Sequence, residues 1–488
     1  MSTDAARTTA GGRVRGESLL LGTLALLTCV TAVVSSLGAP LVPRIARDYG
    51  IGLSSAQWVL TAALLAGAVA TPLVGRLGAG THRRAAVIVT LAVVTAGCLL
   101  SAGSAAWGTG FGSMAAGRAL QGVGMAMTPV AIAVARDAIP EPRTAPSVAL
   151  LSVTTVAGAG LGYPVTGLVV EATGTATAYA VGAGLSALTL VLCARLLPER
   201  RAATAAPVDW VGAVLLALGT LGPLLAVTRA GAWGWTSLRV LVLVAGGAVV
   251  LVAWVAWTRR RTHPLVDLRL AVDTRVLPLH VTALLAGMGM YYLLSLAVIV
   301  VQAPTVEGWG LGRGVLTASL LLVPYSVTSV LGSRAALMVG RRTPALLLPV
   351  GCAMFLGSTA WLAYAHRSLW QVLVAMGLGG IGSGFTFSSL PLLLIPHVPE
   401  AETSSALAVN QLVRFVGMAV GSAVCVVVMT SLGSDGGPGE VGFRDALLAM
   451  SGAWVLVLAA VTVLAGRHPR AAVPGQELEV VHRPLTDG

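Results

Sequence analysis

Long apolar runs, separated by short breaks rich in arginine, glycine or proline, dominate this chain. A helix needs about 20 mostly apolar residues to cross the hydrocarbon core of a bilayer, and such runs recur along the whole sequence. The pattern predicts fourteen membrane-spanning helices, at 18–42, 54–76, 85–106, 111–135, 146–171, 175–197, 210–229, 237–257, 276–303, 314–338, 344–365, 370–396, 404–431 and 443–465. We therefore expect an all-α integral membrane protein.

Composition supports a membrane protein and argues against an enzyme. Only 10% of the 488 residues are charged and 56% are hydrophobic, whereas a soluble domain carries about 25% charged residues. The five cysteines lie singly in apolar runs, and their spacing suggests neither a disulfide framework nor a metal site. No GxxxxGK[ST], HExxH or GxSxG run occurs. We expect no metal, no cofactor and no catalytic residues.

The basic residues indicate how the chain crosses the membrane. All 31 are arginine, and the net charge is +12, which in a soluble protein would suggest a nucleic-acid partner. Between the predicted spans, however, 21 arginines fall on the side of the termini and seven on the other side. The positive-inside rule then places both termini in the cytoplasm. We expect a multi-pass protein of a bacterial inner membrane, with the lipid bilayer and no nucleic acid as its partner.

Three landmarks recur in order at an offset of 258 or 259 residues, which indicates an internal duplication. They pair Arg76, Arg83 and Arg84 with Arg334, Arg341 and Arg342; the run GVGMAMT at 122–128 with GIGSGFT at 380–386; and Gly158 and Gly162 with Gly417 and Gly421. The predicted organisation is a cytoplasmic N-tail (1–17), a six-helix bundle (18–200), two inserted linker helices (201–258), a cytoplasmic loop (259–275), a second six-helix bundle (276–466) and a cytoplasmic C-tail (467–488).

Four motifs resemble the fourteen-helix drug:proton antiporters of the major facilitator superfamily. They are the loop GRLGAGTHRR (75–84), the intramembrane-arginine motif GRALQGVG (117–124), the antiporter motif AGLGYPVTG (159–167) and the phrase VDWVG (208–212) that opens the inserted helices. The chain departs from the family at Ala79, which replaces an acid, at His82, Tyr163 and Leu168, which replace glycines, and at Val34, near an aspartate often found in helix 1.

The resemblance implies two pseudo-symmetric six-helix bundles that work by alternating access, as a monomer. It further implies proton-coupled efflux of a small amphipathic or hydrophobic compound. The missing acids leave open an uncoupled facilitator or a dedicated metabolite carrier. A polytopic membrane enzyme or sensor is a more distant alternative, which would need clustered catalytic residues or a soluble domain, and the sequence shows neither.

Arg118 is the most informative polar residue inside a predicted span. A charge at mid-helix costs about 2.5–3.5 kcal/mol on insertion scales, so such residues face a cavity or a partner. We expect Arg118, with Gln121 one turn on, to face the central cavity and to pair with a titrating acid or an anionic substrate group. The alternative interpretation is a structural arginine that donates to backbone carbonyls of a neighbouring helix.

Other polar residues near the predicted spans have two interpretations each. Glu171, at the edge of helix 5, is either a proton carrier or a solvated interfacial carboxylate, and the second is the more ordinary role. Asn410, Gln411 and Arg414 share one region of helix 13, as the lining of a cavity or as a hydrogen-bonded clamp between helices. Tyr291, Tyr292 and Gln302 of helix 9 are candidates for substrate contact, or for ordinary helix packing.

Glycines four residues apart make smooth helix faces for close contact. We expect the pairs in helices 5 and 13 to lie at the interface between the two bundles and Pro164 to kink helix 5. The predicted gating and packing residues are Gly75, Arg76, Arg83, Arg84, Gly122, Gly158, Gly162, Pro164, Gly167, Gly417 and Gly421.

Overall fold

The structure is a computed structural model that describes residues 2–79, 83–199, 209–261, 264, 268, 273–340, 342–398, 403–433 and 439–467. The first half of the chain (the N-half, 2–199) forms a bundle of long helices with short connecting turns. Its elements are α1 (Ser2–Ser36), η1 (Ala39–Leu41), α2 (Val42–Asp48), α3 (Leu53–Ala56), α4 (Trp58–Ala79), α5 (Arg83–Trp107), α6 (Phe111–Gly122), η2 (Val123–Ala126), α7 (Met127–Ala138), α8 (Glu141–Thr173) and α9 (Thr175–Leu196).

Two inserted helices, α10 (Trp210–Trp233) and α11 (Leu238–Arg259), precede the second bundle (the C-half, 273–467). The C-half contains α13 (Leu277–Gln302), η3 (Thr305–Glu307), α14 (Val315–Gly340), η4 (Pro344–Leu346), α15 (Leu347–Tyr364), α16 (Leu369–Leu394), η5 (Ile395–His397), α17 (Thr403–Ser431) and α18 (Glu440–Arg467). The predicted C-tail from 468 onward and most of the loop at 262–272 lie outside the described residues.

The predicted all-α membrane architecture is confirmed. Thirteen helical segments of the described chain are long and apolar enough to cross a membrane. They do not include α8, whose 33 residues also exceed the length that a bilayer requires. No strand occurs among the described residues. Every predicted span therefore has a long helical counterpart.

The helices differ from the sequence-based boundaries in three places. Helix α1 begins at Ser2, well before the apolar run that starts at Ser18. The start of this run therefore marks the start of the membrane span and not the start of the helix. The first span is also broken at Leu37 and Gly38, before η1 and α2 continue it. The fourth span changes to a 3₁₀ turn at Val123–Ala126 between α6 and α7. Helix α8 is helical throughout, across both Pro146 and Pro164.

The repeated glycines make equivalent contacts in the two halves. A Cβ on Gly158 would lie 2.6 Å from the carbonyl oxygen of Cys29 in α1, and one on Gly417 would lie 2.0 Å from that of Leu284 in α13. Gly162 faces α1 in the same way, and Gly421 faces Met288 of α13. The expectation that these pairs lie between the bundles is wrong, because they pack helices within each half. Glycine spacing gives a close contact but does not identify its partner.

The other glycines of the predicted gating set differ in their contacts. Gly167 of α8 faces the C-half, since a Cβ there would lie 2.6 Å from Ser319 Oγ of α14. Gly122 abuts the backbone of Ala63 in α4, with a Cβ-to-oxygen distance of 2.0 Å. A Cβ on Gly75 would meet nothing within 4 Å, so packing does not require glycine there.

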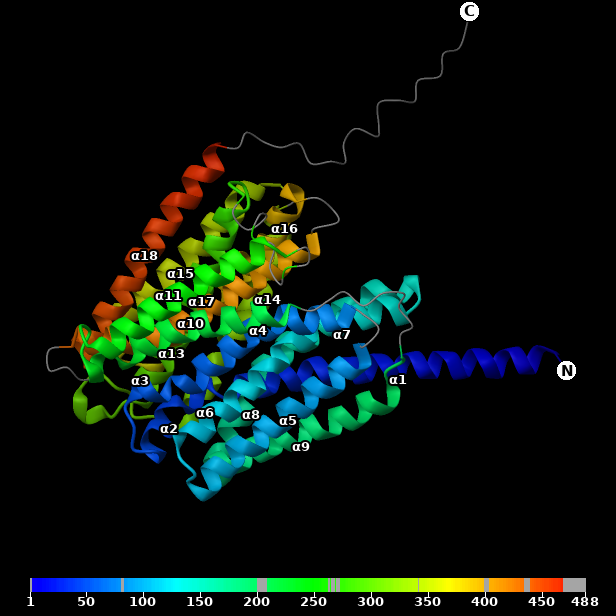
Figure 1. The fold of residues 1–488 in the computed structure, drawn as a ribbon, viewed down its shortest axis with the longest axis horizontal. Coiled ribbons are helices and arrows are strands. Elements are labelled where there is room, and N and C mark those ends of the chain that lie inside the picture. The colour runs from blue at the N-terminus through cyan, green and yellow to red at the C-terminus, as the bar shows by residue number, and fades with distance from the viewer. Residues whose placement is uncertain are drawn as a thin grey trace, which may run out of the picture.

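The two ends of the molecule are arranged differently. We call the end where α1 begins and α18 finishes the terminal face, and the opposite end the far face. Figure 1 shows the N-half helices α1, α5 and α9 and the C-half helices α15 and α18 diverging toward the terminal face. The halves meet along α4 with α17 and along α8 with α14, and α10 packs beside the first of these pairs.

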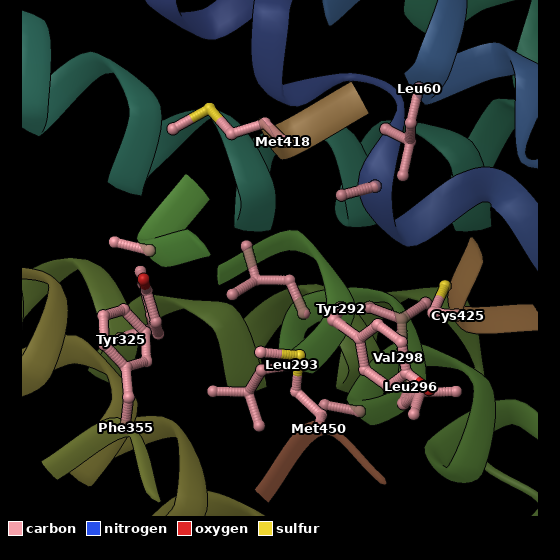
Figure 2. Close-up of a cluster of buried hydrophobic side chains, with 14 of the residues drawn as sticks. Leu60, Tyr292, Leu293, Leu296, Val298, Tyr325, Phe355, Met418, Cys425 and Met450 are labelled. Carbon is pink, nitrogen blue, oxygen red and sulfur yellow. The ribbon is translucent and has the colours of Figure 1, made fainter. Parts of the chain in front are cut away.

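The buried apolar residues follow the same division. The largest cluster joins N-half residues of the far-face end, such as Val42 and Leu60, to the C-half residues Leu296 and Val300 of α13. Figure 2 shows part of it, with Leu60 of α4 across from Tyr292, Leu293 and Val298 of α13. Near the terminal face, one cluster contains only N-half residues and another only C-half residues. The halves therefore share their largest core at the far face. Toward the terminal face each half also has a core of its own, and a smaller cluster of α4, α10, α11 and α17 residues bridges the halves there.

Candidate functional site

Polar contacts between the halves lie near the far face. Thr61 of α4 and Ser422 of α17 bond through their hydroxyls at 2.8 Å, and Gln57 donates to Cys425 Sγ at 3.3 Å. Also at the far face, Gln302 at the end of α13 donates to the carbonyl oxygen of Pro40 at 2.9 Å. These contacts close the molecule at the far face. The hydroxyls and Gln57 were not predicted as site residues, because isolated polar side chains in apolar runs carry no periodic signal.

Glu171 also bonds across the halves. Its Oε2 accepts a hydrogen bond at 3.1 Å from the backbone N–H of Leu316, in the first turn of α14. The carboxylate is exposed, as its interfacial interpretation predicted. A negative charge at a helix N-terminus is stabilised by the helix dipole and by its unsatisfied N–H groups. Glu171 therefore contributes to closure of the far face.

Arg118 is buried and faces backbone carbonyls. Its side chain is about 1% exposed, and its guanidinium donates to Val59 O of α4 at 3.0 Å and to Val34 O and Ser35 O of α1 at 3.1 and 3.3 Å. The two α1 carbonyls belong to the last turn before the break in the first span, where helical donors run out, and Val34 O keeps one backbone bond, from the Leu37 N–H at 3.3 Å. The structure thus matches the structural interpretation, and the expected cavity-facing orientation is wrong for this conformation.

Gln121 completes this hydrogen-bond network. Its Oε1 accepts from Arg118, and its Nε2 donates to Gly97 O at 3.1 Å and Ser101 Oγ at 3.0 Å of α5. Val34 lies near the position where relatives of the fourteen-helix branch often carry an aspartate, and here its carbonyl accepts from Arg118. Backbone dipoles therefore surround the guanidinium where an acid would otherwise pair with it. The sequence could not reveal this, because carbonyl positions depend on where the helix breaks.

The basic residues of the loop motif act mainly within the N-half. Arg83 forms an ion pair with Asp137 of α7 at 2.7 Å, and Arg84 pairs with Glu199 at 2.8 Å and also donates to Ala194 O. Arg76 donates to the carbonyl oxygen of Pro264, in the segment that leads to the C-half. The motif thus ties together helix ends on the terminal face, and Arg76 connects them to the inter-half segment.

In the C-half, Asn410 and Arg414 have different environments. The Asn410 amide nitrogen donates to Leu279 O at 3.4 Å and lies 3.2 Å from His280 Nδ1, so it links α17 to α13 as a clamp. Arg414 donates to Gln411 Oε1 one turn earlier. Its guanidinium carbon lies 4.8 Å from the ring centre of Phe387 in α16. Asn410 therefore acts as a clamp between helices, and the cavity-lining interpretation of Arg414 stays a prediction.

Tyrosines gather where α8 meets α13 and α14. Tyr163 and Tyr325 are buried in the cluster that joins the halves, and Tyr291 packs against it. Tyr292 instead donates from its hydroxyl to Ala446 O of α18 at 3.0 Å, which is ordinary helix packing. Tyr163 was noted only as a departure from the antiporter motif, yet it brings an aromatic side chain to the inter-half region.

Cavities and metal-binding clusters do not change this picture. A pocket of about 620 Å³ opens at the far end of the N-half, lined by residues that include Asp48, Tyr49 and Phe111. It lies beside the closed region and not between the halves. Among the described residues, no three His, Cys, Asp or Glu side chains are grouped to hold a metal ion.

Comparison with known families decides what this architecture is. A family model described as Major Facilitator Superfamily matches residues 24–422. The chain belongs to this superfamily. It is a membrane transporter and not an enzyme. Among curated relatives, it is 26% identical over 480 residues to the Tetracenomycin C resistance and export protein of Streptomyces glaucescens, covering 94% of this chain and 85% of that protein. It is 25% identical over 405 residues to the Multidrug resistance protein Stp of Mycobacterium tuberculosis, covering 80% and 72%.

Solved structures agree on the fold of this superfamily member. A crystal structure of a peptide transporter aligns with a TM-score of 0.67 at 13% identity, covering 92% of this chain and 94% of that one. A nucleoside transporter aligns with a TM-score of 0.65 at 11% identity, covering 91% and 99%. The fold of two six-helix halves plus two inserted helices is thus confirmed for this transporter.

Proposed function

We propose that this transporter exports small amphipathic or hydrophobic compounds from the cytoplasm across the inner membrane, as a monomer, in exchange for protons. The observation that carries the proposal is the asymmetry of the halves, which share their largest core and their polar contacts at the far face and are joined toward the terminal face by a smaller cluster that includes the inserted helices. In this conformation an exporter would load from the terminal face. The names of the curated relatives, two of which are a tetracenomycin export protein and a multidrug resistance protein, support the direction.

The terminal face is the cytoplasmic one in this proposal, because it carries most of the arginines. A cysteine-free protein with Thr274→Cys, in the exposed segment before α13, tests this orientation. An impermeant maleimide should label it only after cells are lysed. Val306→Cys, 97% exposed beside the far face, is the matched control and should react in intact cells. The reverse pattern would place the terminal face outside.

Proton coupling is proposed to act through Glu171. Its carboxylate accepts a hydrogen bond from the other half when the far face is closed, so protonation removes a charge from that contact. A proton taken from outside would then favour opening toward the outside. No aspartate in the first span is needed for this step, which reconciles exchange with the presence of Val34 there.

Flux in proteoliposomes tests the function. A fluorescent amphipathic dye should accumulate when an imposed pH gradient places protons on the far-face side, and collapse of the gradient with a proton ionophore should stop it. Dye movement that follows only its own gradient would favour the uncoupled facilitator. Absence of any dye movement, from protein that is monodisperse in detergent, would contradict export of this class of compound.

A further inference from the structure

Arg414 is a partly buried cation with few partners. Its guanidinium makes one hydrogen bond, to Gln411, and its buried Nε has no partner among the described residues. Arg118, a fully buried guanidinium within a span, makes four. An arginine has five N–H donors and stays protonated in proteins. Most donors of Arg414 are therefore available to another acceptor.

The position of Arg414 in the membrane makes the lack of hydrogen-bond partners energetically unfavourable. It lies eight residues into the apolar span Ala406–Ser431 of α17, about 12 Å of helix rise from the start of that span, and therefore within a hydrocarbon core about 30 Å thick. Arginine at that depth is unfavourable unless a partner or a wet cavity receives it. No carboxylate of the described residues lies within ion-pair distance of it. An anionic group of a bound ligand would supply the negatively charged partner that the described residues do not provide.

Aromatic rings lie on the same guanidinium. Its central carbon is 4.8 Å from the ring centre of Phe387 on α16 and 5.8 Å from that of Phe415. Phe415 belongs to the buried cluster that joins the two halves, and Phe387 packs against that cluster. The rings orient the guanidinium and offer a flat apolar surface beside it. A planar aromatic ligand that carries a negative charge matches both features.

We propose that Arg414, with Gln411, Phe387 and Phe415, forms the substrate subsite for an aromatic organic anion, a compound with a carboxylate or phenolate on a planar ring system. The proposal rests on the export function above and names its substrate class. The guanidinium donates two parallel hydrogen bonds to the anionic oxygens, and the phenylalanine rings contact the substrate rings. Arginine suits this role because its planar fork matches a carboxylate in a bidentate way.

A pair of dyes with one ring system and opposite charges tests the subsite. Fluorescein carries a carboxylate and a phenolate on a xanthene, and rhodamine 6G carries a positive charge on the same tricycle. Binding is measured with purified full-length protein in detergent by fluorescence polarisation, and transport with proteoliposomes. Wild type should bind fluorescein more tightly than rhodamine 6G. Arg414→Gln should bind fluorescein about tenfold more weakly or worse, because a hydrogen-bonded charge is lost.

Two further variants separate charge from structure. Arg414→Lys keeps the charge but loses the planar fork, so its fluorescein affinity should fall between those of wild type and Arg414→Gln. Arg239→Gln removes another cation that lies over an aromatic ring, 5.9 Å from the Trp233 centroid in the inserted helices, and should bind fluorescein as wild type does. Each variant must remain monodisperse, and Arg414→Lys serves as the folded test if Arg414→Gln aggregates.

The outcomes distinguish the two proposals. Equal fluorescein binding by wild type and Arg414→Gln, or stronger binding of rhodamine 6G by wild type, overturns the subsite. Rhodamine export with no fluorescein binding leaves the export function intact and likewise overturns the subsite. Arginine-dependent fluorescein binding without export of either dye supports the subsite and contradicts the export function.

Discussion

Gln302 Nε2 donates a 2.9 Å hydrogen bond to the carbonyl oxygen of Pro40, and this buried bond joins the two halves of the transporter. Pro40 lies in the turn that follows the break in the first span. Arg118 holds the other side of that break through Val34 O and Ser35 O. The broken turn is therefore fixed by one side chain from its own half and by one from the opposite half. Only the hydrogen bond from Gln302 to Pro40 must break when the far face opens.

Gln302→Met should shift the transporter toward a conformation open at the far face. The substitution keeps side-chain length but removes the donor and leaves a buried carbonyl without its partner, at about 1–3 kcal/mol. Cys425, fully buried at the inter-half contact with Gln57, is the reporter once the other four cysteines are replaced by alanine. An impermeant maleimide added from the far side should label Cys425 about fivefold faster or more in the variant.

Gln371→Met is the matched control for this labelling. Gln371 makes its hydrogen bond to Ser368 within the C-half, at the start of α16. Its loss should leave the labelling rate of Cys425 unchanged. Equal rates for wild type and Gln302→Met would show that the bond to Pro40 does not hold the far face closed.

Gly167 and Gly162, both on α8, should respond differently to enlargement. A Cβ on Gly167 would lie 2.6 Å from Ser319 Oγ of the C-half, whereas one on Gly162 would lie 3.0 Å from Val33 Cα in its own half. Gly167→Leu should leave each half folded and prevent closure of the far face, so transport is lost with little change in Tm. Gly162→Leu should lower Tm by several degrees, because overpacking costs about 1–3 kcal/mol. Thermal unfolding and dye flux measured on both variants check this, and equal loss of Tm in both would contradict it.

The sequence predicted the spans well, because a bilayer imposes a length and a polarity that any apolar run reveals. The duplication could also be predicted, since Gly122 and Gly380, or Gly158 and Gly417, occupy equivalent close contacts in which a Cβ does not fit. What could not be predicted was the partner of each contact. A glycine four residues from another gives a smooth helix face, but the tertiary fold decides whether α1 or α14 packs on it.

The polar residues of the site illustrate the same limit. Arg118 and Arg414 look alike in the sequence, as single arginines in apolar runs. Arg118 lies beside a helix break that exposes carbonyl groups, and the hydropathy pattern does not show that break because Leu37 and Pro40 are apolar. Arg414 has no such break beside it. The surroundings of Arg118 therefore contradict the cavity-facing role expected for it, whereas both interpretations of Arg414, cavity lining and clamp, stay predictions.

Arg118→Ala should destabilise the N-half and not merely inactivate transport. It removes a donor from three backbone carbonyls, those of Val34, Ser35 and Val59, beside a side chain that is about 1% exposed. Val34 O keeps the Leu37 N–H at 3.3 Å and Val59 lies inside α4, so the main loss falls on Ser35 O, and a buried acceptor left unsatisfied costs about 1–3 kcal/mol. We expect poor insertion or aggregation in detergent, measured by size-exclusion chromatography. Arg118→Lys should recover part of the monodisperse fraction, since an ammonium group donates to fewer carbonyls. A monodisperse Arg118→Ala that has lost only transport would restore the cavity-facing interpretation.

His366 should make the transporter less stable in acid. It lies between α15 and α16, outside the spans, and its ring is about 2% exposed, against Phe443 at a centroid distance of 4.9 Å. Burial lowers the pKa of His366 below its ordinary value, although the charge of Glu440, 3.7 Å from Nε2, opposes this shift. Arg367, which pairs with Glu440 at 2.7 Å, adds to the lowering. The folded protein therefore binds a proton on His366 less readily than the unfolded chain does.

Linkage gives the direction of the pH effect. Below about pH 6.5, the ordinary pKa of histidine, the unfolded chain takes up a proton that the folded protein refuses, so stability falls as the pH falls. His366→Asn keeps a donor for the Leu362 carbonyl, which His366 Nδ1 contacts at 3.2 Å, but cannot titrate. The fall in Tm between pH 7.5 and pH 5 should be smaller in His366→Asn than in wild type. Glu440→Gln removes the opposing charge and lowers the pKa of His366 further. This variant should therefore retain the fall in Tm on acidification. A wild-type Tm that rises on acidification, and does so only when His366 is present, would instead mean that protonated His366 pairs with Glu440 and stabilises the far face.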